Sequence, residues 1–217
     1  MSTITVARRP QAVRSADTRA RVIEAAIDCL HRLGYSATTV SVVAEAAGVS
    51  RGGMTHQFPT KTALMLAVVR AVFELDSDHY NRSLELMSPR AWMHALPSTM
   101  WAVISQPSGI AVMEIMLASR SDPGLADELR AMQQRIDRRA HAWVLDRHRA
   151  AGLAERPDGE AVHRVFVAAV RGLALEAVFM KNRAEVEQSI AVLAETLRHL
   201  YPELAREEDD QPGDARD

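Results

Sequence analysis

Hydrophobic residues recur every three to four positions along almost the whole chain, and no segment alternates β-branched and polar residues as a half-buried strand does. The first apolar stripe runs from about Thr18 to Leu33, and Gly34 follows it where a left-handed helix C-cap belongs. Proline, glycine, serine and threonine separate the later stripes, and these residues end or cap helices. The pattern therefore predicts an all-α protein.

Three helices are expected to lie within about 45 residues near the start of the chain. After the first helix, Thr39 can cap a short helix at 40–47, and Ser50 can cap another at 51–58. A longer and richly apolar helix at 61–79 then connects this three-helix head to the rest of the chain.

The remainder of the chain is predicted to be a helical body followed by a tail. The first expected helix of the body follows Ser88-Pro89 and holds Trp92, Leu96 and Trp101. After a helix at 109–119, a long helix opens at Asp122-Pro123 and is broken at Gly152, and two more follow at about 159–181 and 185–201. From residue 202 onward the chain is acidic and has almost nothing to bury, which is typical of disorder. We therefore expect a head at 1–66, a body at 67–201 and a disordered acidic tail at 202–217.

Charge is distributed unevenly, although the formal net charge is only −2. Residues 1–70 carry nine Lys or Arg and four Asp or Glu, a net charge of +5, whereas residues 71–217 carry a net charge of −7. The basic head is compatible with a nucleic-acid partner.

Cysteine content and the absence of long apolar segments indicate where the protein acts. The lone Cys29 excludes an internal disulfide. The lack of a signal peptide or long apolar span predicts a cytoplasmic protein without a membrane partner.

The segment from Thr39 to Phe58 meets the requirements of two short helices that cross steeply. Such a crossing needs a small residue at the contact, here Ala44, and a residue that tolerates positive φ in the turn, here Gly48. Met54 and Phe58 lie four residues apart and point inward together. The outward residues of the second helix are then Arg51, Gly52, Thr55 and His56.

Over roughly residues 18–66 the sequence resembles the tetracycline-repressor (TetR) family. The matching positions are residues 18–26, 34–35, 38–40 and 47–52, together with Ala44, His56, Phe58, Lys61 and Leu64. The resemblance implies a homodimeric transcription regulator that holds double-stranded operator DNA with its head and binds a small-molecule effector in its body, most often as a repressor. The family usually has tyrosine where Thr55 stands, and threonine can still reach a phosphate or a thymine methyl group.

By resemblance, the two short helices present residues to the major groove of DNA. Arg51 is the expected base reader because its guanidinium fork matches guanine O6 and N7, while Gly52 and Gly53 let the backbone come close. Lys61 begins the next helix and suits a phosphate. The expected DNA-binding residues are Thr39, Ser41, Ser50, Arg51, Gly52, Gly53, Thr55, His56 and Lys61. The arginines nearer the N-terminus either follow the minor groove as an arm or belong to a solvated tail; they are Arg8, Arg9 and Arg14.

The last two predicted helices are apolar on more than one side, so each is buried on more than one side. Resemblance implies that they form a four-helix bundle with a second copy of the chain, and the alternative is that they complete the core of the monomer. The expected dimer residues are Phe166, Val170, Leu173, Ile190, Leu193 and Leu197. Arg171 and Glu176 interrupt the apolar pattern, and an ion pair at the dimer face would explain both.

The resemblance also implies a pocket among the middle helices of the body, which are rich in methionine and tryptophan. The expected ligand-binding residues are Trp92, Met93, Trp101, Met113, Glu114, Met116 and Met132, although plain core packing explains each of them too. Glu114 interrupts an apolar run, so its carboxylate needs a partner, water or a cationic ligand. The effector is expected to be small and mostly apolar.

Catalysis is disfavoured because the sequence has no nucleophile elbow, phosphate-binding loop, dinucleotide fingerprint, zinc-protease motif or cysteine–histidine metal cluster. No cofactor and no metal are expected. The alternatives to a DNA-binding regulator are a helical protein-interaction module and a small-molecule enzyme. The charge asymmetry and the outward polar residues Arg51, Thr55 and His56 favour DNA binding over both.

Overall fold

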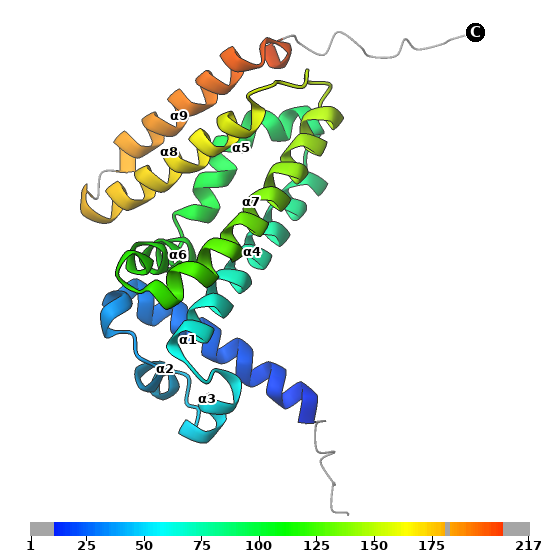
Figure 1. Ribbon diagram of the computed structural model, residues 1–217. Coiled ribbons are helices and arrows are strands. Elements are labelled where there is room, and N and C mark those ends of the chain that lie inside the picture. The colour runs from blue at the N-terminus through cyan, green and yellow to red at the C-terminus, as the bar shows by residue number, and fades with distance from the viewer. Residues whose placement is uncertain (1–10, 181–182, 206–217) are drawn as a thin grey trace, which may run out of the picture. The chain divides into compact units, whose positions relative to one another are not determined.

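A computed structural model describes residues 11–180 and 183–205 of the chain (Figure 1). Every regular element within these ranges is helical, so the predicted all-α class is confirmed. The α-helices are α1 (Gln11–Ala37), α2 (Val40–Ala46), α3 (Arg51–Gln57), α4 (Lys61–Glu85), α5 (Pro89–Ile104), α6 (Pro107–Ala118), α7 (Pro123–Ala150), α8 (Gly159–Met180) and α9 (Arg183–Leu200). Two short 3₁₀ helices, η1 (Ser119–Ser121) and η2 (Pro202–Ala205), complete the set.

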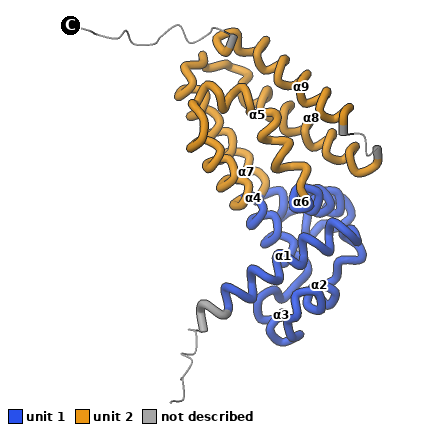
Figure 2. The backbone as a smooth tube through the Cα atoms, turned by 180° about the vertical axis from the view of Figure 1, so that it is seen from behind, with its two compact units in different colours: residues 1–73, 107–132 blue, residues 74–106, 133–217 orange. Residues whose placement is uncertain are grey.

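The helices form two compact units, coloured separately in Figure 2. Unit 1 is drawn from residues 1–73 and 107–132, and unit 2 from residues 74–106 and 133–217. Unit 1 therefore contains α1, α2, α3 and α6 together with the first parts of α4 and α7. Unit 2 contains α5, α8 and α9 together with the last parts of α4 and α7.

Helix α1 is the central element of unit 1, where it packs against α2 and α6. It begins at Gln11 rather than near Thr18, and Gly34 interrupts it with a φ of 74°, at the position where the sequence predicts a left-handed residue. Its buried side chains include Cys29, and burial raises the pKa of that thiol. Leu33, in contrast, belongs to the predicted apolar stripe and is 50% exposed.

Two hydroxyl N-caps fix the starts of helices α2 and α3, and one glycine forms the turn between them. The Thr39 hydroxyl accepts a hydrogen bond from the backbone N–H of Val42 at 3.2 Å, and the Ser50 hydroxyl accepts one from Gly53 at 3.2 Å. Between the two helices, Gly48 adopts a φ of 62°, which an L side chain rarely tolerates. Both caps and the left-handed turn follow the sequence pattern.

The core of unit 2 is built around Trp92 on α5, which is completely buried against side chains of α8, α9 and η2. The indole N–H of Trp92 donates to the hydroxyl of Ser83 at 2.8 Å, so its polar atom is satisfied inside the core. Helix α5 begins with the Ser88 cap and carries Pro97 in its interior.

The ordered chain continues past the point where the sequence predicts a disordered tail. Residues Pro202–Ala205 form η2, because Leu204 is 3% exposed and belongs to the unit 2 core. Arg156 also donates to the backbone oxygen of Leu200 at 3.0 Å, which fixes the end of α9. The remainder of the expected tail, 206–217, lies outside the described residues.

No single helix in the described ranges is long and apolar enough to cross a membrane. The consecutive helices α5 and α6, which are bent at the break between them, satisfy the same test of length and composition together. Buried core helices satisfy that test as well.

Candidate functional site

Helix α3 separates its buried side chains from its polar ones. Met54, and Phe58 just after the helix, are each 1% exposed and pack into unit 1. Arg51, Thr55 and His56 are exposed on the other side. A helix of seven residues with an exposed basic and polar face has the size and chemistry of an element that enters the major groove of DNA.

The hydroxyl groups near α2 and α3 already have partners inside the protein. Thr39 and Ser50 act as N-caps, and the Thr55 hydroxyl donates to the backbone oxygen of Arg51 at 3.0 Å. Within the described ranges, the side chains of Ser41, Arg51 and His56 form no hydrogen bond. Among the expected DNA-binding side chains, these three are therefore the ones without a hydrogen bond inside the described protein.

The two glycines of α3 differ in the space around them. A Cβ atom on Gly52 would have no neighbour within 4 Å, whereas one on Gly53 would lie 3.2 Å from Val49 Cγ1 and 3.3 Å from the hydroxyl of its own cap, Ser50. The open side of Gly52 leaves its backbone accessible to a partner. A side chain at Gly53, in contrast, would need Val49 or Ser50 to shift by a few tenths of an ångström.

Residues near the start of α1 contact the end of α3 and hold it in place. The amide nitrogen of Gln57 donates to the hydroxyl of Ser15 at 2.7 Å and to its backbone oxygen at 3.3 Å. The Arg19 guanidinium lies 4.6 Å from the centre of the Phe58 ring. The sequence contains no signal that pairs these residues, because their contact depends on how the helices cross.

Lys61 lies within unit 1 rather than in the exposed position that a phosphate contact would need. Its ammonium donates to the backbone oxygen of Tyr35 at 2.6 Å and sits 3.9 Å from the centre of the Tyr35 ring. Burial lowers the pKa of Lys61, and the carboxylate of Asp122 opposes that shift. The structure thus assigns Lys61 a partner that the sequence did not suggest.

Glu114 has a partner of the same kind. Its carboxylate accepts a hydrogen bond from the backbone N–H of Tyr35 at 3.0 Å, beside the break in α1 at Gly34. The Tyr35 hydroxyl donates to Asp122 at 3.5 Å. The sequence leaves three possibilities for the Glu114 carboxylate, namely a partner, water or a cationic ligand. The structure shows a partner inside the protein.

The arginines near the N-terminus cannot be placed in the same way. Arg8 and Arg9 lie outside the described residues, as does the side chain of Arg14.

The expected ligand-binding residues are divided between the two units. Trp92, Met93 and Trp101 belong to unit 2, where the first two are completely buried and the third is half-buried. The other four belong to unit 1; they are Met113, Glu114, Met116 and Met132. Core packing accounts for Trp92 and Met93.

The expected dimer residues also fall into two groups. Four of them are at most 8% exposed and form part of the core of unit 2; they are Phe166, Val170, Ile190 and Leu197. Leu173 and Leu193 instead line a mainly apolar groove of about 420 Å³ between α8 and α9, together with Ala169, Gly172, Glu176, Ser189 and Val192. Beside this groove, Val165 and Phe179 on α8 are 63% and 75% exposed.

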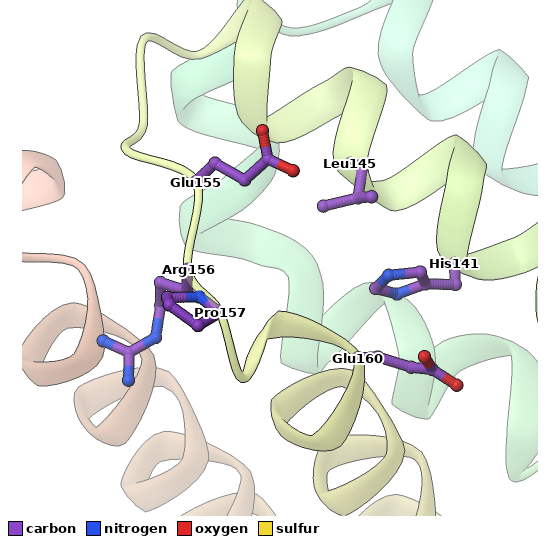
Figure 3. A pocket seen from close by; sticks show the side chains of 6 residues that line it. All are labelled: His141, Leu145, Glu155, Arg156, Pro157 and Glu160. Atoms are coloured by element: carbon purple, nitrogen blue, oxygen red, sulfur yellow. The ribbon is translucent and has the colours of Figure 1, made fainter.

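A second recess, of about 430 Å³, lies where the loop after α7 meets the start of α8 (Figure 3). His141 and Leu145 project into it from α7. Its two carboxylates already have cationic partners, since Glu155 lies 3.8 Å from Arg149 and Glu160 lies 2.9 Å from Arg164. Its lining is polar and largely solvated, and no group of metal-ligating side chains occurs within the described residues.

Helix α2 precedes α3 in the three-helix head, and α3 exposes a polar face. This arrangement is that of helix-turn-helix DNA-binding proteins. Residues 22–68 match the sequence profile of bacterial regulatory proteins of the tetR family, and residues 90–203 match that of the tetracyclin repressor-like C-terminal domain. Because the second match alone covers more than half of the chain, the chain belongs to the TetR family of DNA-binding transcriptional regulators.

Individual relatives agree with this assignment. The HTH-type transcriptional regulator CymR of Pseudomonas putida is 27% identical over 201 residues, which is 92% of this chain and 98% of CymR. The HTH-type transcriptional regulator RutR of Escherichia coli K12 is 37% identical over 71 residues, 33% of this chain and 32% of RutR. The matched domains and relatives are all transcriptional regulators, a family that is not enzymatic, so the expectation of a non-catalytic protein is confirmed.

Solved structures share the fold at low sequence identity. GusR of Salmonella enterica superposes with a TM-score of 0.65 at 22% identity and covers 86% of this chain and 96% of its own. A putative transcriptional regulator from Saccharomonospora viridis, solved in complex with choline, superposes with a TM-score of 0.66 at 17% identity and covers 86% of this chain and 98% of its own.

Proposed function

We propose that this regulator is a homodimeric repressor that leaves its operator when a small, mostly apolar effector binds. The observation that carries the proposal is the exposed face of α3, where Arg51 and His56 have no partner within the described ranges and Gly52 leaves the backbone open. Arg51 reads a guanine, and Ser41 and His56 bind bases or phosphates. The protein acts in the cytoplasm, where its operator DNA lies.

Dimerisation would use the groove between α8 and α9. Its apolar lining, which includes exposed Val192, and the neighbouring exposed side chains Val165 and Phe179 would lose contact with water against a second copy of the same surface. A two-fold dimer presents two copies of α3 to one face of DNA and so reads a pseudo-palindromic operator.

Effector control is supported by the family and by one neighbour. The solved regulator from Saccharomonospora viridis was captured with choline, which is a small molecule. For this chain, an effector that prefers the released form of the dimer would weaken DNA binding by about 5- to 150-fold for a coupling of about 1 to 3 kcal/mol. Operator DNA would weaken effector binding by the same factor.

Selection of DNA from a random library, followed by a salt-titrated gel-shift assay on the enriched sequence and on the region upstream of the gene, tests this function. We expect a pseudo-palindrome to be enriched and the log of affinity to fall linearly with the log of salt concentration. Failure of any sequence to be enriched over the random pool would contradict the proposal.

A further inference from the structure

Tyr201, the residue between α9 and η2, has a buried hydroxyl group without a partner. Its side chain is 1% exposed, and within the residues that the structure describes its hydroxyl forms no hydrogen bond. The backbone is fixed on both sides, since the N–H of Tyr201 donates to the oxygen of Leu197 at 3.0 Å and its oxygen accepts from the N–H of Leu204 at 2.9 Å. Buried hydroxyl groups are almost always hydrogen-bonded, so this one needs an explanation.

Two neighbours contact the Tyr201 ring but leave its hydroxyl unbonded. The His148 ring on α7 meets it nearly edge-on, with ring centres 4.8 Å apart and an angle of 67° between the planes. The Arg156 guanidinium lies 5.7 Å from the ring centre. All three guanidinium nitrogens donate elsewhere, two to the Asp158 carboxylate at 2.9 Å and one to the backbone oxygen of Leu200 at 3.0 Å.

Tyr201 lines a small cavity inside unit 2. The cavity has a volume of about 10 Å³ and lies among α5, α7, α8 and α9, and its other polar lining residues are His148 and His163. The rest of the lining has no polar side chain and comprises Leu96, Val144, Gly159, Val162, Phe166 and Leu197. One buried water needs on the order of 10 to 15 Å³ and about two to four polar partners. The cavity therefore has the size for one water and three polar groups to bind it.

The two histidines can supply hydrogen-bond acceptors. His148 is 8% exposed and His163 is half-buried, and neither ring forms a hydrogen bond within the described part of the chain. Burial lowers the pKa of both rings, that of His163 to about 4, so both are neutral near pH 7. A neutral imidazole has one nitrogen that accepts a hydrogen bond and one that donates.

We propose that this cavity is a binding site for one ordered water molecule, which accepts a hydrogen bond from the Tyr201 hydroxyl and donates to ring nitrogens of His148 and His163. The water would join α7, α8 and the end of α9 through bonds that these side chains do not make directly. The cavity is too small for an organic molecule. A purely apolar cavity stays empty, and the three polar groups distinguish this one.

A crystal structure of the full-length protein near pH 7.5, where both imidazoles are neutral, tests the proposal directly. We expect one density peak in the cavity, at about 2.6 to 3.2 Å from Tyr201 Oη and from a ring nitrogen of His148 or His163. A cavity without density, or a hydroxyl that bonds directly to a histidine, would overturn the proposal.

A matched pair of variants tests which group binds the water. Tyr201→Phe removes the hydroxyl and keeps the ring, and it should abolish the density peak. In solution it should also abolish nuclear Overhauser transfer from water to the methyl groups of Val144 and Val162, which line the cavity. Tyr80→Phe removes a phenol of unit 2 outside the cavity lining and should leave both signals unchanged.

Water that persists in Tyr201→Phe would overturn the assignment of the hydroxyl as its ligand. The methyl spectra show whether each variant folds. If Tyr201→Phe does not fold, the density in the parent protein still decides the proposal. Neither result bears on operator selection, so the proposed repressor function is tested separately.

Discussion

At the scale of single residues, the sequence identified which groups need an explanation but not which partner each one has. Glu114 illustrates the difference, since a carboxylate in an apolar run must have a partner. Its partner is the N–H of Tyr35, 79 residues earlier in the chain. No local pattern specifies that pair, because it depends on the packing of α6 against α1. The outward placement of Arg51 and His56 was predictable, because helical periodicity alone determines it.

Arg51→Ala tests the proposed base reader. Loss of a paired contact to guanine should reduce operator affinity by about 1 to 3 kcal/mol and relax the preference at one base pair of each half-site. Gel-shift titrations over all single-base variants of the selected operator measure both effects. Arg32→Ala, which removes an exposed arginine paired with Asp28 elsewhere on α1, is the matched control. An equal loss on every sequence would assign Arg51 to a phosphate instead.

Gly52→Ala should stabilise the free protein and weaken its binding to DNA. The new Cβ meets no atom within 4 Å, so the helix gains about 0.5 to 1 kcal/mol in the free energy of unfolding. The same methyl group would occupy the space through which the backbone approaches DNA. Denaturant unfolding and operator titration measure the two effects separately. Unchanged DNA affinity would show that the backbone at Gly52 does not come close to the operator.

At the scale of elements, the sequence predicted the nine α-helices of the described residues but neither short 3₁₀ helix, and its other errors lie at helix ends. Helix α1 extends back to Gln11, because apolar periodicity marks only the buried part of a helix and not its solvated first turns. The predicted dimer helices are both present, yet four of the six named residues face the core of the same chain. A helix that is apolar on two sides does not reveal which side another copy covers.

Lys61→Ala tests how the start of α4 is fixed to the end of α1. Losing the bond to the Tyr35 oxygen and the contact with the Tyr35 ring should lower the free energy of unfolding by about 1 to 2 kcal/mol. The slope of log affinity against log salt should stay the same, because the ammonium faces the protein. A slope reduced by roughly one, with stability unchanged, would support Lys61 as a phosphate contact.

Val192→Glu tests the proposed dimer face without disturbing the fold. Val192 lines the groove between α8 and α9 and is 57% exposed in the single chain, so a carboxylate is tolerated there in a monomer but is buried without a partner in a dimer. We expect monomers of unchanged helicity in light scattering and circular dichroism. Ala191→Glu, which adds the same charge at an exposed position outside the groove lining, should remain dimeric. A Val192→Glu dimer would place the interface elsewhere.

At the scale of the whole molecule, the sequence separated head from body but not the membership of each compact unit. Helix α6 lies in the body by sequence order, yet it belongs to unit 1 with α1. The interaction of Asp76 with Arg171 could not be predicted either, because the two residues are 95 positions apart. The sequence noted Arg171 only as an interruption in an apolar pattern.

The acid stability of the protein should depend on His163. Burial, followed by the charge of His141, lowers the pKa of His163 to about 4 from 6.5, so the unfolded chain binds a proton more readily between these values. His163 therefore lowers the free energy of unfolding as the pH falls from about 6.5 to about 4, by up to roughly 3 kcal/mol. Asp76 acts in the opposite direction, since its raised pKa favours folding as the pH falls below about 7.

The variant His163→Gln separates these effects. Urea unfolding near pH 7.5 and near pH 4.5 should show that the variant loses less stability on acidification than the parent protein does. His31→Gln, at an exposed position of α1, is the control and should follow the parent. Equal acid sensitivity in His163→Gln would mean that another group governs it.

The single buried thiol makes the molecule convenient for distance spectroscopy. Cys29 is the one cysteine of the chain and is 4% exposed, and burial keeps its pKa raised, so it is shielded from reagents that attack thiolates. A nitroxide label could therefore be attached to a cysteine introduced at exposed His31 of α1, outside the proposed DNA-binding residues, while Cys29 stays in place. In a dimer the two labels would report the distance between the two DNA-binding heads as a distribution, measured with and without operator DNA.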